Sequence, residues 1–570
     1  MNTETQRVEI ASEIEAGLEH HRVGRWRRLT EAELKAKVPE QFVLGWQVSV
    51  PPRSLQFAEV DYLVLAIDNA FPNSQPRVFA PAAGSDFFWP HVEQKGLLCL
   101  RPSRNTASPA ERIAVHLDDA EELLNYPEMK RREEFEREFV AYWGQRATAA
   151  TDRDKVLSLV SPRGIAREVF FFHDGKTHRY VIGDDKTSLK KWLRNSGVNP
   201  SDKEIFSTWL FRLSRPWTPK EFPGTGGEII RLLPPNLARQ CLMPGMKSPF
   251  LFEVQTPTGT AFAAVVLRGS GHKDLVKGFR NISKVPVERI ISSYAKRPVE
   301  RHAVSRVDGA WVHGRDQPSS YAEIKGRKVS IVGCGAIGSA LARLLAQAGV
   351  GEIIFVDGDS LSTANISRHA LGIEYIGLNK ALSLQSALRK QFPHLTFEHV
   401  FPKRFERLSS KELDYLASAD LILTAGIDFD GEAALDTWRR TLPRPPAYIS
   451  TWAEAYAIVG HAVMLFGNNS ILTGFDAEER PKFRLTDWPE EAGALIVEAG
   501  CGNTFQPHGV IDLHPIIGLA ASLALDGLLN RVLSSCRRVW MGDPTIVEAH
   551  GGKTFSTFTD RSMIREFVWQ

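Results

Sequence analysis

Three glycines spaced as G-x-G-x-x-G stand at the start of the most regular segment of the chain. Gly333, Gly335 and Gly338 lie in KVSIVGCGAIGSALARLLAQAG, between an apolar run typical of a buried strand and a helical run. The first glycine permits a tight turn, the second lets the backbone approach a phosphate, and the helix N-terminus presents free N–H groups to the anion. Asp357 follows Gly338 by 19 residues, where a carboxylate can accept hydrogen bonds from ribose hydroxyls. The pattern predicts a nucleotide-binding site.

Four polar residues after this turn distinguish a redox dinucleotide from ATP. A hydride transferase needs an apolar slot for the nicotinamide ring, whereas an adenylating enzyme needs cations near the phosphates and a metal that spreads the developing charge. Asn365, Arg368 and Lys380 supply donors and positive charge, and Asp428 offers a hard oxygen ligand for Mg²⁺. Each charge alone would more often be a solvated surface residue, and it is their match to the family spacing described next that favours ATP with Mg²⁺ over a dehydrogenase.

The stretch VDGDSLSTANISRHALG resembles the D-x-D-x-V-x-x-x-N-L-x-R-Q signature of the ThiF/MoeB family, which includes the ubiquitin-activating enzymes. The resemblance covers roughly residues 325–530 and implies adenylation of a protein C-terminus with ATP and Mg²⁺. In this sequence His369 replaces the glutamine of the signature, and the loop before the lysine is one residue shorter. The matching positions are Asp357, Asp359, Asn365, Arg368, Lys380 and, as the magnesium-holding aspartate, Asp428.

The same resemblance implies a homodimer, because such families often complete the nucleotide site with an arginine from the partner subunit. The segment SRVDGAWVHGRDQ, ahead of the glycine turn, offers Arg306 and Arg315 for this role. The sequence does not choose between them.

The five cysteines are few, scattered and odd in number, so they argue against a disulfide framework. The absence of a C-x-x-C pair argues against a common structural zinc site. They are Cys99, Cys241, Cys334, Cys501 and Cys536.

Cys501 stands in LIVEAGCGNTFQPHGVIDLHPIIG, a polar, glycine-flanked stretch ahead of an apolar helical run. Its placement resembles the short crossover loop of the autophagy-type activating enzymes. A loop thiol is accessible and can be activated by a nearby base, for which His508 and His514 are candidates. The sequence therefore favours a nucleophile at Cys501 over a small packing residue.

Cys99 lies in FPNSQPRVFAPAAGSDFFWPHVEQKGLLCLRP, which resembles the core of a ubiquitin-conjugating enzyme over roughly residues 40–145. There a proline-rich stretch and a His-Pro-Asn turn precede Gly-x-(Ile/Leu)-Cys-Leu. This sequence has WPHV in place of His-Pro-Asn, so the donor that would stabilise an oxyanion is unassigned. His91 is a candidate for that donor, or for a residue that only orients the loop.

A conjugating-like domain ahead of an activating-like domain resembles a bacterial family, the fused ubiquitin-transferase-like enzymes of CBASS anti-phage operons. The resemblance implies that the enzyme activates the C-terminus of a cGAS-like cyclic-oligonucleotide synthase and passes it to an acceptor amine. A related class acts on bacterial ubiquitin-like proteins, and the sequence does not separate the two. Either way we expect a relay from an acyl-adenylate to Cys501, then to Cys99, and then to the amine.

Two other functions stay open at this stage. An activator of sulfur-carrier proteins would use the adenylation site alone and would be indifferent to Cys99. A partner-binding protein with a degenerate nucleotide site would catalyse no pyrophosphate exchange.

Three domains must position these residues, since 570 residues are too many for one core. Residues 1–150 predict an α+β conjugating-enzyme-like domain with a helix, a strand meander and closing helices. Residues 151–305 predict a connecting α+β domain with two hairpins, one turning at Asp174 and Gly175. Residues 306–570 alternate strand and helix, which predicts a doubly wound α/β, Rossmann-like adenylation domain with a parallel sheet.

Composition limits the remaining classes of function. Apolar residues make up 43% and charged residues 24% of the chain, which is ordinary for a globular protein, and the net charge is only +3. We therefore expect no direct nucleic-acid partner and no membrane partner. The N-terminus lacks the pattern of a signal peptide, and the longest apolar run is interrupted by Asp526, so we expect a cytoplasmic protein.

Overall fold

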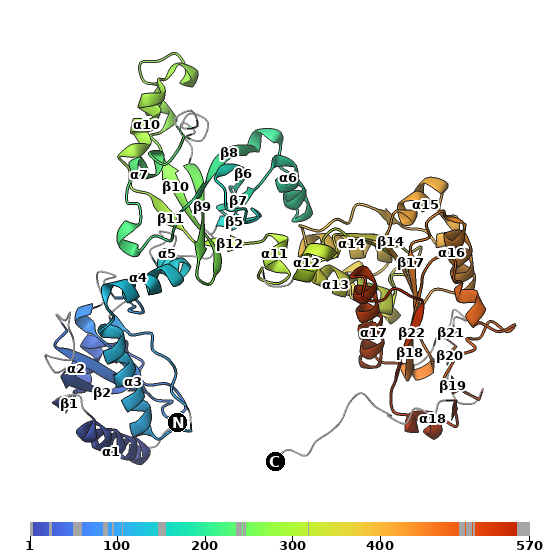
Figure 1. The fold of residues 1–570 in the computed structure, drawn as a ribbon, viewed down its shortest axis with the longest axis horizontal. Coiled ribbons are helices and arrows are strands. Elements are labelled where there is room, and N and C mark those ends of the chain that lie inside the picture. The colour runs from blue at the N-terminus through green and yellow to red at the C-terminus, as the bar shows by residue number, and fades with distance from the viewer. Residues whose placement is uncertain are drawn as a thin grey trace.

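The computed structural model describes most of the chain, in three parts that follow one another in sequence (Figure 1). The described residues are 4–21, 25–49, 60–83, 89–93, 96–104, 106–145, 156–234, 237, 242, 247–316, 319–489, 496–497, 504–505 and 508–555.

The first part is a four-stranded antiparallel sheet with helices packed against it. The strand order is β1-β2-β3-β4, with β1 Trp26–Arg28, β2 Phe42–Ser49, β3 Tyr62–Asp68 and β4 Arg77–Phe79. The helices are α1 Glu4–His20, α2 Glu31–Lys37, α3 Pro109–Leu124 and α4 Glu128–Arg137. Ser108 and Glu111 form a capping box at the start of α3, and Pro109 follows the cap. The predicted helix and strand meander are therefore present.

The second part is built on an eight-stranded sheet of order β11-β10-β9-β8-β6-β7-β5-β12. Both predicted hairpins form: β6 pairs antiparallel with β7 around the turn after Asp174, and β9 pairs with β10. The strands are β5 Val156–Ser158, β6 Arg167–Asp174, β7 Arg179–Gly183, β8 Ile205–Arg212, β9 Lys247–Thr256, β10 Gly259–Arg268, β11 Glu300–His302 and β12 Val304–Arg306. The helices are α6 Lys186–Asn195, α7 Gly226–Ile230, α9 His272–Val276 and α10 Val287–Ala295.

Helix α5, Phe139–Gln145, joins the first part to the second. It follows α4 in the chain, but Phe139 and Trp143 are buried in the core of the second part, and the Trp143 indole N–H donates to the carbonyl of His302 at 3.0 Å. Figure 1 shows α4 and α5 between the two sheets. The end of the first domain is therefore anchored in its neighbour.

The third part is a seven-stranded sheet of order β15-β14-β13-β16-β17-β18-β22. Its strands are β13 Lys328–Val332, β14 Glu352–Val356, β15 Val400–Phe401, β16 Leu421–Ala425, β17 Ala447–Ala453, β18 Val459–Leu465 and β22 Cys536–Met541. Helices α11 Gly309–Val312 and α12 Ser319–Ile324 lead into the sheet. The other main helices are α13 Ala336–Ala348, α14 Lys380–Gln391, α15 Ser410–Ala417, α16 Phe429–Thr441 and α17 Val510–Leu528.

The sheet is doubly wound as predicted but not wholly parallel. The five strands β15, β14, β13, β16 and β17 are parallel to one another. Strands β18 and β22 run antiparallel to their neighbours. The reason is the connection from β17 to β18, because residues 454–458 are too few for the crossover that a parallel pair needs. A parallel sheet throughout is therefore corrected to a mixed one.

Two short strand pairs and a short helix complete the described part of the C-terminal region. Strands β19 Thr486–Asp487 and β23 Lys553–Thr554 pair with each other, as do β20 Ile496–Val497 and β21 Thr504–Phe505; α18 is Thr545–Ala549.

Helix α17 is the one described helix whose length and composition would suit a membrane span. Here it is a core helix, because Ile516, Ala520 and Leu523 are fully buried among residues of α13 and β18. This placement agrees with the sequence interpretation of a buried helix.

Candidate active sites

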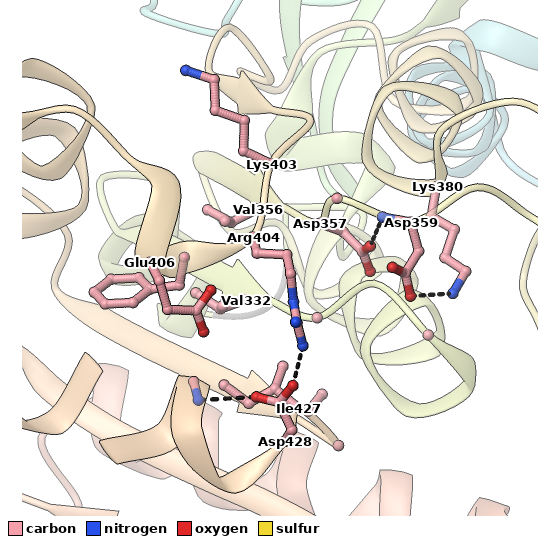
Figure 2. A pocket seen from close by; sticks show the side chains of 17 residues that line it. Val332, Val356, Asp357, Asp359, Lys380, Lys403, Arg404, Glu406, Ile427 and Asp428 are labelled. Carbon is pink, nitrogen blue, oxygen red and sulfur yellow. Dashed lines mark hydrogen bonds and ion pairs between the residues drawn. The ribbon is translucent and has the colours of Figure 1, made fainter. Parts of the chain in front are cut away.

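The first candidate site is a cavity of about 190 Å³ at the carboxyl ends of β13, β14 and β16 (Figure 2). In the sheet β13 lies between β14 and β16, so the order of the chain reverses at this point. Open α/β sheets bind ligands at such switch points. The cavity is lined by Val332, Gly333, Gly335, Val356, Asp357, Gly358, Asp359, Lys380, Lys403, Arg404, Phe405, Glu406, Ala425, Gly426, Ile427, Asp428 and Gly431.

The glycine turn has the geometry that its spacing predicts. Gly333 has φ +89°, a backbone conformation that other residues rarely adopt. Gly335 caps α13, and a side chain there would point into open space, so the position is free for a ligand. Gly338 does not line the cavity; a Cβ on it would lie 1.9 Å from the Gly333 carbonyl, so it lets the helix pack on the turn.

Asp357 is a partly buried acid of the cavity. It accepts hydrogen bonds from the backbone N–H of Cys334 at 2.6 Å and of Asp359 at 2.7 Å, which fix its carboxylate beside the glycine turn. Burial raises the pKa of Asp357, and these two hydrogen bonds oppose that shift. At the cavity edge Lys380 contacts Asp359 at 3.1 Å between Nζ and Oδ2. The acid and the cation thus lie where a ribose and phosphates would meet.

Asp428 stands on the opposite side of the cavity, at the N-terminus of α16. Its Oδ1 accepts the Gly431 N–H at 2.9 Å, so it is the N-cap of the helix. Its Oδ2 forms an ion pair with Arg404, which Figure 2 shows reaching across the cavity. A Mg²⁺ ion in such sites is held by one or two carboxylates together with substrate phosphates, and the half-exposed Asp428 fits that donor set.

Arg404 was not singled out from the sequence. It follows β15 with Lys403, and β15 lies beside β14 in the sheet. The carboxyl ends of parallel strands meet at one edge of a sheet. The pair KR, directly after the strand-like run EHVF, was therefore the sequence signal for a cation at this edge. Figure 2 shows Lys403 pointing away from Asp428, so Arg404 is the cation of this pair that faces the acid.

Asn365 and Arg368 lie on the segment between β14 and α14 and are not among the lining residues. The Asn365 side chain accepts hydrogen bonds from the Ser362 backbone and hydroxyl, and Arg368 reaches the Ala364 carbonyl at 3.4 Å. Their contact with a nucleotide stays a prediction.

His369 shows why the departure from glutamine is tolerated. Its Nδ1 accepts the Leu371 N–H at 3.1 Å, so Nε2 carries the proton and donates to the carbonyl of Cys334 at 2.6 Å. Burial lowers the pKa of His369, which favours this neutral form. A neutral imidazole offers one donor and one acceptor, as an amide does. His369 therefore ties the segment to the glycine turn.

The two candidate arginines for a partner's site differ sharply in their surroundings. Arg306 is buried and forms bidentate contacts with both Asp308 and Asp316. Arg315 is exposed and lies in a left-handed turn at φ 54°. Since a guanidinium shared by two carboxylates is not available to another subunit, the structure favours Arg315.

The second candidate site is around Cys99 in the first part of the molecule. Cys99 is exposed, and its thiol donates to Oε1 of Glu93 at 3.1 Å. Gly96 has φ +78°, and a Cβ on it would lie 2.1 Å from the Ala80 carbonyl, so only glycine fits this turn. Partial desolvation, and then the carboxylates of Glu93 and Glu138, raise the pKa of the Cys99 thiol to about 11.

His91 holds the loop that carries this site. Its carbonyl accepts the Cys99 N–H at 2.7 Å, and its own N–H donates to the Tyr142 hydroxyl at 2.5 Å. Its ring nitrogens lie 3.3 Å from Glu134 and 3.4 Å from Glu138. Because both ring nitrogens face carboxylates, the side chain acts as a tie to α4, and this geometry favours the orienting role over the oxyanion donor.

A buried arginine organises the neighbouring proline-rich stretch. The Arg112 guanidinium donates to the carbonyls of Pro72 and Ser74 and to the Ser103 hydroxyl, and it lies over the ring of Phe71. The FPNSQP stretch is therefore fixed to α3.

Cys501 lies outside the described residues, as does Cys241, so the predicted nucleophile has no structural account. Of its candidate bases, His514 is exposed on α17 and its Nδ1 lies 2.8 Å from the Val510 carbonyl. His508 precedes the helix and is not without an interaction partner. Cys334 is buried and Cys536 is partly buried.

Comparisons with known proteins find matches over the two regions that contain the candidate sites. Residues 314–437 match the ThiF family, and residues 27–151 match the prokaryotic E2 family B. The ATP-dependent ubiquitin transferase-like protein Cap2 of Pseudomonas aeruginosa is 31% identical over 367 residues, which are 61% of this chain and 63% of that protein. Ubiquitin-like modifier-activating enzyme 5 of Mus musculus is 27% identical over 27% of this chain and 40% of its own length. The chain thus spans less than two thirds of either relative.

One solved structure represents the structural likenesses. Escherichia coli MccB in complex with ATP is 16% identical, with a TM-score of 0.29, and the match covers 37% of this chain and 59% of MccB. At this TM-score the likeness supports no inference.

Proposed function

We propose that the chain is an ATP-dependent protein-conjugating enzyme of the fused kind in which a ubiquitin-conjugating-like domain precedes a ThiF-type domain; the two family matches and the similarity to Cap2 support this. The C-terminal domain adenylates the C-terminus of a partner protein. The acyl group then passes to Cys501, from there to Cys99, and finally to an acceptor amine.

The observation that carries the proposal is the cavity that brings Asp357, Lys380 and Asp428 together at the switch point of the sheet. The N–H groups at the start of α13 and the Lys380 ammonium face the space where phosphates would lie. Once Asp428, its ion-pair partner, binds a metal, the Arg404 guanidinium can stabilise the negative charge that develops on the phosphates. When bound at Asp428, Mg²⁺ supplies charge neutralisation at the phosphates. Among the ligands named in the sequence analysis, we propose Asn365 and Arg368 as residues that close on the nucleotide.

The relay explains why two reactive thiols stand in one chain. A thioester intermediate divides a difficult acyl transfer into easier steps. The test is incubation with ATP and a candidate partner, followed by gels with and without reductant. Cys501→Ala should still form the adenylate but no thioester, and Cys99→Ala should trap the partner on Cys501. Normal loading of Cys99 in Cys501→Ala would contradict the order of transfer.

For the partner we propose a cGAS-like nucleotidyltransferase of an anti-phage operon, or a bacterial ubiquitin-like protein in the same role. Both offer a free C-terminus, and both fit the relationship to Cap2. Offering each purified protein in the same gel assay separates the two.

We also propose a homodimer through the ThiF-type domains. The large apolar side chains of Ile373, Leu378 and Leu382 support this, because they lie close together in sequence and are exposed, as side chains of an interface would be in a single subunit. Sedimentation at micromolar concentration should show two copies, and a monomer would count against it.

A further inference from the structure

The residue beside Cys99 is unusual for the neighbour of a nucleophile. Glu93 and Cys99 belong to one tight hairpin, in which the Glu93 N–H donates to the Leu97 carbonyl at 2.7 Å and the Gly96 N–H donates back to Glu93 at 3.1 Å. Val92 and Leu98 form a bridge between its two arms. The Glu93 carboxylate therefore has a fixed backbone and lies 3.1 Å from the sulfur.

This carboxylate does not help the thiol to attack. A negative charge beside the sulfur opposes the thiolate, which is the form that reacts. Glu93 accordingly contributes to the raised pKa of Cys99. If the contact between Glu93 and Cys99 is functional, Glu93 must assist a step in which the sulfur is not the nucleophile.

Such a step is the discharge of a Cys99 thioester to an amine. Acylation removes the S–H proton, so the Glu93 oxygen that accepted it becomes open beside the reacting carbon. An acceptor ammonium is attracted to this carboxylate but cannot attack until it loses a proton. A base within hydrogen-bond reach of the nucleophile can remove that proton.

We propose that Glu93 is the catalytic base for transfer from Cys99 to the acceptor amine; this rests on the proposed function, in which Cys99 carries the acyl group. Glu93 first takes one proton from the acceptor ammonium and releases it to solvent, and the neutral amine nitrogen then forms a bond to the thioester carbonyl carbon while Glu93 takes a second proton from it. The C–S bond then breaks, the electron pair leaves with sulfur, and Glu93 returns the proton to the thiolate. The products are an amide and the Cys99 thiol, hydrogen-bonded to Glu93 as in the structure.

The charges around Glu93 and Cys99 favour a cationic acceptor. Glu138 is 41% exposed at the end of α4 and adds a second negative charge near the sulfur. Arg77 on β4 partly offsets it. Among the described residues, the charged and titratable groups around Glu93 and Cys99 are Arg77, His91, Glu134, Glu138 and Tyr142. Lysine side chains carry the charge that this set attracts.

The experiment compares single-turnover discharge of the Cys99 thioester to two nucleophiles in wild type and Glu93→Gln. One nucleophile is a free lysine side chain, which is protonated at neutral pH, and the other is hydroxylamine, which is not. We expect Glu93→Gln to load Cys99 at least as fast as wild type, to discharge to lysine about 100-fold more slowly, and to discharge to hydroxylamine nearly as fast as wild type. Raising the pH should partly restore the lysine reaction in the variant, because more of the amine is then unprotonated.

The matched control is Glu122→Gln, which removes a carboxylate from α3 of the same domain, where it pairs with Lys130 and Arg101 on the surface. It should behave as wild type with both nucleophiles. An unchanged lysine rate in Glu93→Gln, or an equal loss with both nucleophiles, would overturn the assignment while the relay stands. Absence of any thiol-sensitive adduct on Cys99 in the wild-type enzyme would overturn the proposed function, and the base assignment with it.

Discussion

Asp428 combines two tasks that one substitution can separate. It caps α16 through the Gly431 N–H, and its charge faces Arg404 and the cavity. Asn is as good an N-cap as Asp, so Asp428→Asn removes the charge and keeps the cap. We expect Asp428→Asn to reduce partner-dependent ATP–pyrophosphate exchange by about 100-fold or more, because the metal ligand is lost. Asp428→Ala should do the same and also destabilise the domain by about 1 kcal/mol.

Thermal denaturation and exchange assays on the two variants check this separation. Asp430→Asn, on the exposed side of the same helical turn, is the control and should leave exchange unchanged. Full exchange activity in Asp428→Asn would refute the magnesium assignment.

The raised pKa of Cys99 makes a second prediction about a single residue. With a thiol pKa of about 11, little thiolate exists at neutral pH, and the fraction keeps rising as the pH increases. Alkylation of Cys99 by iodoacetamide should therefore climb about tenfold per pH unit up to roughly pH 10, whereas in denatured protein it should level off above about 8.5. Mass spectrometry of the Cys99 peptide measures both rates. A plateau near pH 8.5 in the folded protein would show that the carboxylates do not act on the sulfur.

Functional residues that belong to a sequence motif could be predicted from the sequence, whereas those that depend on contacts between distant segments could not. The glycine turn, Asp357, Lys380 and Asp428 follow from spacing and converge on one cavity. Arg404 was missed because the KR pair after EHVF gains its meaning only from the position of β15 beside β14 in the sheet. Glu93 was missed because a glutamate in a loop is ordinary until its distance to a thiol is known.

Helix α5 is the element whose role could least be predicted. Its sequence reads as the end of the first domain, yet its aromatic residues complete the core of the second. Periodicity predicts that a helix forms and which face is apolar, but not which of two neighbouring sheets will cover that face. The short β17–β18 connection is a similar case, because strand direction depends on loop length rather than on strand composition.

Because α5 also carries Tyr142, it links the second domain to the Cys99 loop. The Tyr142 hydroxyl accepts the His91 N–H, and His91 in turn accepts the Cys99 N–H. Tyr142→Phe leaves the His91 N–H without this acceptor, at a cost of about 1–3 kcal/mol to the loop. We expect transfer of the acyl group to Cys99 to slow by about tenfold, since 1.4 kcal/mol corresponds to that factor. Adenylation should be unaffected.

A matched variant is Tyr126→Phe, which also removes one hydroxyl from the first domain but lies beside Lys130 rather than His91. It should transfer at the wild-type rate. Equal rates for the two variants would show that Tyr142 only fills space in the core.

At the scale of the whole molecule, the second domain contacts both neighbours through specific polar groups. Towards the third domain, Asn195 at the end of α6 is buried; it donates to the Pro393 carbonyl at 2.9 Å and accepts from Arg389 of α14 at 3.0 Å. Towards the first, the contact is made by α5. The connecting domain is therefore a structured spacer rather than a flexible linker, and its contacts would set the distance that an acyl group travels in the proposed relay.

The proposed homodimer can be tested by mixing two inactive variants. If Arg315 of one subunit completes the nucleotide site of the other, Arg315→Ala and Asp428→Asn should each lack exchange activity as homodimers. In a mixed dimer, the subunit that carries Arg315→Ala keeps Asp428 and receives an intact Arg315 from its partner, so one of the two sites is complete. Mixing equal amounts of the two variants and allowing subunits to exchange should recover about a quarter of wild-type activity, since half of the dimers are mixed and each has one active site. If the arginine acts within its own subunit, each mixed dimer contains two defective sites and no activity returns. Arg306→Ala cannot replace Arg315→Ala in this test, because the loss of the Asp308 and Asp316 contacts would disturb the fold around β12 in either case.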